Sequence, residues 1–313
     1  MMDVAMQVMD THEDTTSFIA GHDPGISRAA LIRQTNNAIA EFDELRESLR
    51  ERPRNLSIFA KEARRLAGLF HMVSQDAPEV SLFLRLQARA VGADAARRAP
   101  GDRPVQVDLG KLGPIDLPRT QEQPPALLRL RHVVDGYHAA FAAGDQPALA
   151  LLAQAPLERM TRVPPTVEEQ AYMLSHARGL QMLAQGIPGG NQLLLNAIKG
   201  CESPEMIPAV RDSARLLASP EIELALLHSQ SDEEARAARL PTFDEALRNA
   251  LVLHRQYWRD FEPNPGERQN KDPVGFIALG PLAWATLRRD RGFACGITSD
   301  YLPRSVIESH AKN

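Results

Sequence analysis

Apolar residues recur at helical spacing along most of the chain. Over residues 56–73 they alternate steps of three and four without a break, and a looser stripe of the same kind covers residues 31–49. This spacing places apolar side chains on one helix face, which predicts two amphipathic helices. Ser27 is suited to cap the first helix and Pro53 separates it from the second, while a third helix is predicted over residues 79–98.

Residues 99–125 follow a different pattern. Apolar and polar residues alternate over 105–109 and again over 115–117, with two glycines between these segments. A period of two is typical of strands, so one small β-hairpin is predicted near 105–117. A lone hairpin is marginally stable, so we expect it to lie against helices. Any subdivision of the helical part of the chain is expected near 99–125.

Helical patterns return with residues 127–141, which carry one apolar face. Three later segments, 166–169, 231–234 and 242–245, place a hydroxyl three positions before a carboxylate. Such a pair satisfies two backbone amides of a first helical turn, so each segment predicts a helix start. A long amphipathic stripe then covers residues 247–261.

Asp272 and Pro273 have the character of a helix start, because an aspartate caps and proline is tolerated in the first turn. We predict a helix from there to Gly292. Inside it, Gly280 and Pro281 are expected to kink or loosen the axis.

Together these patterns predict an all-α fold. Short loops favour antiparallel neighbours, so we expect an irregular bundle of antiparallel helical hairpins with the one β-hairpin. The arrangement would be tetratricopeptide-like, although the sequence lacks the strict repeat period of such arrays. Residues 1–20 are expected to form a mobile N-terminal tail, and residues 21–313 a single helical domain.

Charge and composition narrow the range of partners. The chain has 36 Lys and Arg against 40 Asp and Glu, and no basic region marks a nucleic-acid surface. Neither a signal peptide nor an apolar run long enough to cross a membrane is present. Cys201 and Cys295 form no CxxC pair, and so few cysteines fit a reducing compartment. We therefore expect a cytoplasmic protein with neither a nucleic-acid nor a membrane partner.

The sequence offers no recognisable reaction centre. None of the nine histidines belongs to an HExxH motif, no GxSxG is present, and the glycine-rich turn at 186–190 lacks the Lys-Ser/Thr of a P-loop. We predict no catalytic, cofactor-binding or metal-ligating residues, and no enzyme.

An aromatic cluster near the end of the long stripe has two interpretations. Tyr257, Trp258 and Phe261 are expected to pack in the core. Alternatively, beside Arg255 and Arg259, they form an exposed binding hot spot. Core packing is the preferred interpretation.

The C-terminal region resembles the immunity protein 49 family of bacterial polymorphic toxin systems. The resemblance rests on His-Arg-Gln-Tyr-Trp, on Asp-Pro-Val-Gly-Phe-Ile-Ala-Leu-Gly-Pro-Leu-Ala and on a closing Asp-Tyr-Leu-Pro. The motif residues are His254, Tyr257, Trp258, Asp272, Pro273, Gly275, Phe276, Gly280, Pro281, Tyr301 and Pro303. The resemblance implies an all-α immunity protein that is encoded beside a toxin and protects the producing cell.

Several motif residues have a structural interpretation of their own. Asp272 is expected to cap and Pro273 to occupy a first turn. Gly275 and Gly280 permit close helix approach, and Phe276 is expected to be buried. The toxin interface is therefore left unassigned.

The leading functional hypothesis is neutralisation of a cognate toxin by stoichiometric binding. One alternative is a helical-repeat-like adaptor that binds another protein or peptide. Another is an enzyme that reverses the toxin's modification, which would require a clustered titratable pocket.

Overall fold

The computed structural model describes residues 17–21, 23–111, 113–120, 130–160, 167–204, 206, 208–260 and 269–309. Its elements in chain order are β1 (Ser17–Ile19), α1 (Arg28–Ser48), η1 (Pro53–Asn55), α2 (Leu56–Val73), α3 (Glu79–Ala96), β2 (Val105–Asp108), β3 (Pro114–Leu117), α4 (Leu130–Ala143), α5 (Gln146–Leu152), α6 (Leu157–Met160), α7 (Val167–Ala184), α8 (Gly190–Cys201), α9 (Pro208–Ser213), the π-helix η2 (Ala214–Ala218), α10 (Ser219–Leu227), α11 (Asp232–Ala237), α12 (Phe243–Asp260), the 3-10 helix η3 (Pro273–Phe276), α13 (Leu279–Asp290), β4 (Ile297–Ser299) and α14 (Arg304–Ser309). The prediction of an all-α fold with a small hairpin is confirmed.

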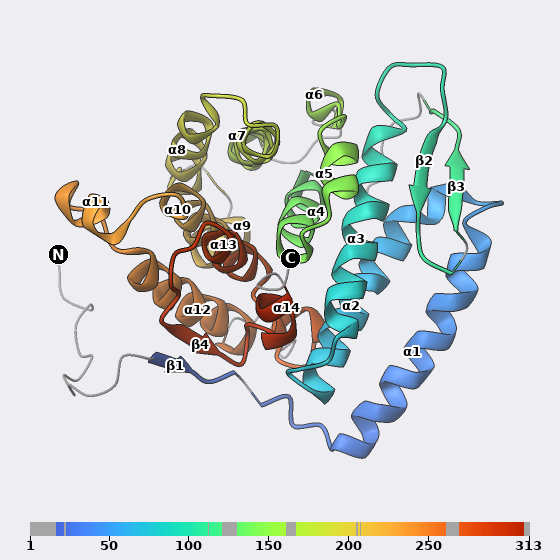
Figure 1. Cartoon of the computed structure of the whole chain (residues 1–313), viewed down its shortest axis with the longest axis horizontal. Coiled ribbons are helices and arrows are strands. Elements are labelled where there is room, and N and C mark those ends of the chain that lie inside the picture. Colours follow the sequence, from blue (N-terminus) through green and yellow to red (C-terminus); the bar gives the residue numbers. More distant parts are fainter. Residues whose placement is uncertain are drawn as a thin grey trace.

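Helices α1, α2 and α3 form one side of the molecule (Figure 1). Their contact is aromatic: the ring of Phe42 stacks on that of Phe59 at 4.4 Å and meets Phe83 edge-on at 5.4 Å. The predicted stripes thus face each other, and burial of such rings is a large apolar contribution. Ser27 accepts from the amide of Ala30, as expected of a helix cap.

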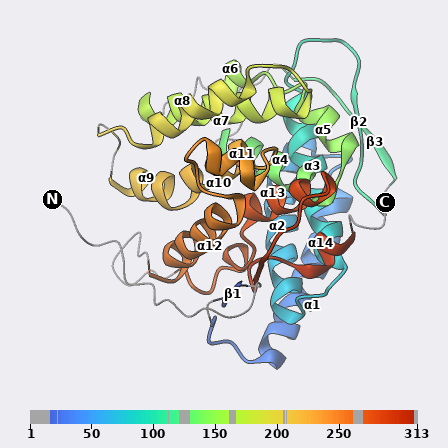
Figure 2. The same ribbon diagram turned by 60° about the vertical axis from the view of Figure 1, so that its left-hand side comes forward.

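Helix α13 packs against α4 in the middle of the molecule, although the two are far apart in sequence (Figures 1 and 2). Trp284 of α13 and Tyr137 of α4 are both fully buried. The C-terminal part of the chain therefore completes the core and is not appended to its surface.

The predicted hairpin is present as antiparallel strands β2 and β3. Val105 lies opposite Leu117 and Val107 opposite Ile115, and these four side chains are buried. Strand β2 lies against α3, as expected of a hairpin that needs a helical support.

A second two-stranded sheet was not predicted. Strand β1 pairs in parallel with β4, with Ser17 opposite Ile297 and Ile19 opposite Ser299. The predicted N-terminal tail extends to residue 20, whereas residues 17–19 form strand β1 in the structure. The rest of that tail, residues 1–16, lies outside the described residues.

The helix predicted from Asp272 to Gly292 is wrong in its middle. Asp272 caps only the short η3, the chain is extended at Ile277, and α13 starts afresh at Leu279. Pro281 explains the break: it lacks an amide hydrogen and would clash with the carbonyl four residues earlier, so it occupies a first turn. Gly280 and Pro281 begin a helix instead of kinking one.

Two of the three predicted capping boxes are seen. Glu234 accepts from the Ser231 amide at 2.8 Å, and Glu245 accepts from the Thr242 amide at 2.7 Å. The predicted box at 166–169 lies outside the residues whose side chains are described.

Candidate functional site

The motif residues meet where α12, η3 and the start of α13 come together. Nε2 of His254, on α12, lies 2.8 Å from the carbonyl oxygen of Gly275. The His254 ring meets that of Tyr301 edge-on, with the ring centroids 5.0 Å apart. A Cβ on Gly275 would lie 2.5 Å from Cδ2 of Trp258. The indole therefore packs directly on the η3 backbone, which only glycine permits here.

Helix η3 is fixed from both sides. Asp272 accepts from the Val274 amide at 3.0 Å, Pro273 begins the turn, and Phe276 is buried. From α2, Arg64 donates to the carbonyls of Val274 at 3.2 Å and Ile277 at 2.7 Å. Sequence reasoning missed Arg64, because nothing in an amphipathic helix shows which distant backbone an arginine will bind.

The remaining motif residues hold the C-terminal segment in place. A Cβ on Gly280 would lie 2.7 Å from Cδ of Glu221, so α10 and α13 approach closely there. Pro281 is buried in the first turn of α13. Tyr301 is fully buried and its carbonyl accepts from Ala278. Pro303 is buried, and its carbonyl accepts from the third and fourth residues of α14, Val306 and Ile307.

A cavity of about 320 Å³ lies beside this cluster and is lined by Tyr257, Trp258, Arg64, Arg131, Asp135, Tyr172, Met173, Ser213, Leu217, Glu221, His254, Val274, Ile277 and Leu279. We call it the motif cavity. Tyr257 and Trp258 are half-buried, with ring centroids 5.4 Å apart, so they border a cavity instead of filling the core. Phe261, the third member of the predicted aromatic cluster, lies outside the described residues.

The charges in the motif cavity neutralise one another. Arg131 pairs with Asp135 at 2.9 Å and with Glu221 at 3.2 Å. Burial lowers the pKa of Arg64 to about 10 and raises the pKa of Glu221, which Arg131 opposes. The Ser213 hydroxyl donates to a backbone carbonyl, at 2.9 Å from Val210 O, and not to a general base. The cavity is thus a charge-balanced structural junction with no evident nucleophile–base pair.

Two histidines without an evident motif come together in the core. His138 of α4 and His176 of α7 have ring centroids 5.8 Å apart and are fully buried. Within the described residues, no ring nitrogen of either histidine has a hydrogen-bond partner. Burial lowers the pKa of both, to about 3 for His176, so both rings are neutral. Sequence spacing could not reveal this pair, because only packing of α4 on α7 creates it.

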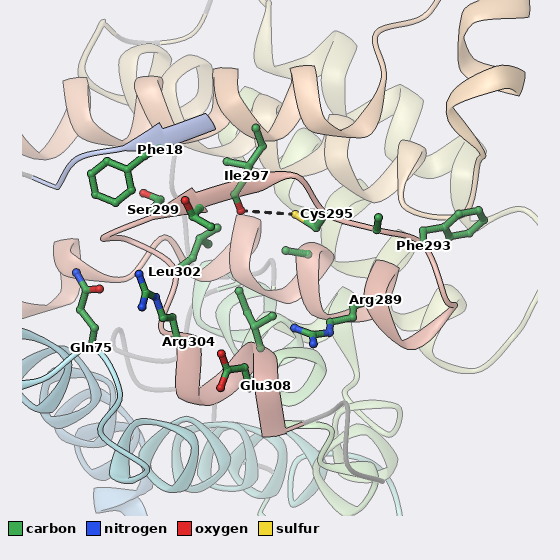
Figure 3. Close-up of a pocket in the computed structure, with 14 residues that line it drawn as sticks. Phe18, Gln75, Arg289, Phe293, Cys295, Ile297, Ser299, Leu302, Arg304 and Glu308 are labelled. Atoms are coloured by element: carbon green, nitrogen blue, oxygen red, sulfur yellow. Dashed lines mark hydrogen bonds between the residues drawn. The ribbon is translucent and has the colours of Figure 1, made fainter. Parts of the chain in front are cut away.

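A second hollow, which we call the β4 groove, lies between strand β4 and helices α13 and α14 (Figure 3). Its volume is about 520 Å³, and it is lined by Phe18, Gln75, Ala285, Arg289, Phe293, Ala294, Cys295, Ile297, Thr298, Ser299, Leu302, Arg304, Ile307 and Glu308. Figure 3 shows Phe18 and Phe293 at opposite ends, with Arg304, Glu308 and Arg289 across from the strand. No sequence motif indicated this surface.

The described part of the chain gives two further results. No group of three or more His, Cys, Asp or Glu side chains in it is placed to hold a metal ion. None of its helices has the length and apolar character needed to span a bilayer.

Comparison with known protein families gives a match over most of the chain. A family model described as Immunity protein 49 matches residues 58–306, which is most of the chain. No curated protein and no solved structure matches.

Proposed function

Because the chain belongs to the immunity protein 49 family, we propose that it neutralises a toxin encoded beside its own gene by binding that toxin directly, one to one. The family match over residues 58–306 is the observation that carries this proposal. We place the complex in the cytoplasm of the producing cell, where the toxin would otherwise act.

The geometry supports a binding function better than a catalytic one. In the motif cavity the charged side chains are committed to one another and to backbone carbonyls. The core is closely packed around Trp284, so the described surface is a firm support for a partner. A stable complex of this kind buries about 1,600 Å² of surface, which a rigid helical protein can supply without refolding.

The test combines protection and stoichiometry. The neighbouring gene is expressed in a susceptible cell with and without this chain, and growth is measured. The purified chain is then mixed with an inactivated form of the toxin, and the mass of the complex is determined by light scattering. We expect full protection and a one-to-one complex. Neither protection nor a complex would overturn the proposal.

Titrating the chain against active toxin separates binding from repair. Protection by binding ends when toxin exceeds the chain, whereas an enzyme that reverses the toxin's product protects at a small fraction of the toxin concentration. Full protection at a chain concentration of about one hundredth of the toxin concentration would contradict stoichiometric neutralisation.

A further inference from the structure

We propose that the β4 groove is the surface on which the toxin docks, and that it receives a toxin segment with an apolar side chain next to a carboxylate. This inference rests on the proposed function and adds to it the place of contact and the chemistry of the segment.

The groove has an apolar floor between two aromatic ends. Ala285, Ile297, Leu302 and Ile307 line it, and Phe18 at one end is 57% exposed. Removing an exposed phenylalanine and the neighbouring apolar surface from water is favourable, so a partner that covers them gains binding free energy. Such aromatic side chains around a pocket are the usual anchors of protein interfaces.

The charged side chains around the rim of the groove indicate the sign of the charge that the partner should carry. Arg289 and Arg304 are exposed and line the groove, and neither guanidinium makes an ion pair or hydrogen bond within the described part of the chain. Glu308, also exposed, is the single acidic residue among the lining side chains. The groove is therefore locally cationic although the whole chain has a net charge of -4. A carboxylate from the partner can pair with a guanidinium in two parallel hydrogen bonds.

The walls of the groove are held rigidly. The Ser299 hydroxyl donates to Ile19 O at 2.7 Å, which ties β4 to β1. His71 of α2 contacts the carbonyl of Asp300 at 2.6 Å, just after β4. On the other side, Ser305 of α14 donates to Ala77 O at 2.9 Å. A preformed groove loses little entropy on binding, which favours its use as a docking site.

The primary test measures affinity for the inactivated toxin with single and paired variants. Phe18→Ala removes the aromatic end, and the double variant Arg289→Glu/Arg304→Glu reverses the rim charge. We expect about tenfold weaker binding for the first and about a hundredfold for the second. All three side chains are exposed, so unchanged circular dichroism and thermal midpoint will show that the variants fold.

Two matched controls use exposed residues that do not line the groove. Arg291→Glu changes a neighbouring arginine, and Val252→Ala truncates an apolar side chain on α12 that is 50% exposed. Both should bind within twofold of the unmodified chain. Loss of affinity in these controls equal to that of the groove variants would overturn the assignment.

Glu308→Gln gives a test with the opposite sign. Removing the one carboxylate of the rim raises the positive charge that faces an acidic segment, so binding should tighten severalfold at low salt and less at high salt. A merely structural role for α14 would give no gain. Weaker binding of Glu308→Gln would refute the acidic character of the partner segment.

Cys295 provides a readout that needs no substitution. It lines the groove and is partly exposed, whereas Cys201, the other cysteine of the sequence, is 2% exposed. Bound toxin should slow alkylation of Cys295. If toxin binds and protects cells but Cys295 reacts at its free rate and the groove variants bind normally, the groove is wrong and the proposed function stands. If the unmodified chain neither binds nor protects, the proposed function itself fails.

Discussion

Mild acid should destabilise the protein through three buried histidines around Trp284. The rings of His138 and His228 lie 5.9 and 4.8 Å from the indole, and His176 lies beside His138. Burial lowers the pKa of all three, to about 3 for His176 and about 4 for His228. The folded chain therefore keeps these rings neutral at a pH where the unfolded chain protonates them.

The size of the effect follows from the two pKa values of each ring. For His228 they are 6.5 unfolded and about 4 folded. Between these values the unfolded state binds the extra proton, so the stabilising contribution is complete above pH 6.5 and is lost as the pH falls toward 4. One pKa unit is worth about 1.4 kcal/mol, which gives a loss of about 2 kcal/mol at pH 5. His176 and His228 together would remove about 4 kcal/mol, a large share of the about 5–15 kcal/mol that stabilises a typical domain, and the lowered pKa of His138 acts in the same direction.

The assay is urea unfolding followed by circular dichroism at pH 7.5 and pH 5.0. Because burial raises the pKa of Asp94 and Glu221, these carboxyls change stability in the opposite direction, so a variant is needed to isolate one histidine. His176→Leu replaces a ring whose nitrogens lack partners within the described residues, so an apolar side chain is acceptable there. We expect its loss of stability between the two pH values to be about 2 kcal/mol smaller.

The control is Leu180→Ala, one turn further along α7, which removes buried volume without changing a titratable group. It should lower stability about equally at both pH values. If His176→Leu kept the full pH dependence of the unmodified chain, the reasoning from buried neutral histidines would be refuted.

Three substitutions test the junction around η3. Gly68→Ala places a methyl group 2.5 Å from the carbonyl carbon of Pro273, so the free energy of unfolding should fall by about 3 kcal/mol, although alanine is the better helix former. Gly275→Ala forces Trp258 to move and should cost about 2 kcal/mol in urea unfolding, and much less in a chain that already carries Trp258→Ala. Arg64→Met removes two hydrogen bonds, one to the carbonyl of Val274 in η3 and one to that of Ile277 just after it, so amide exchange in η3 should accelerate at least tenfold.

Each of these predictions has a clear contrary result. Equal or higher stability of Gly68→Ala would mean that α2 and η3 are not in backbone contact. Additive losses for Gly275→Ala and Trp258→Ala would mean that glycine is not needed for the indole. Unchanged exchange in Arg64→Met would mean that the other contacts of η3, from Asp272, His254 and Trp258, are sufficient to hold it.

Local patterns predicted the elements well where the determinants are local. The apolar stripes of α2 and α3 and the alternation over 105–117 depend on neighbouring residues, so the spacing of apolar residues was sufficient to predict these helices and the hairpin. Asp272 and Pro273 were also read correctly as a turn start. The predicted helix was wrong only in its middle, because the Gly280–Pro281 pair begins a new helix and does not kink a continuous one.

Features that depend on distant segments were beyond sequence reasoning. Strand β1 has three residues, and its partner lies 280 positions along the chain, measured from Ser17 to Ile297. Arg64 binds carbonyls that are 210 and 213 positions away, and carbonyls carry no residue signature. The β4 groove is assembled from β1, the turn after α2, α13, the loop that follows α13, β4 and α14, so no contiguous segment contains its pattern. The motif cavity was likewise hidden, although its aromatic residues had been singled out.

The parallel pairing of β1 with β4 has a consequence for biosynthesis. A ribosome makes Ser17 long before Ile297, so β1 cannot form this pairing until residues 297–299 have emerged. One wall of the groove therefore forms only after synthesis of the 280 positions that separate Ser17 from Ile297. Prematurely terminated products that lack residues 297–299 would leave the edge of β1 unpaired, and such an edge can pair with another chain and cause aggregation. The same products would lack one wall of the groove proposed to bind the toxin.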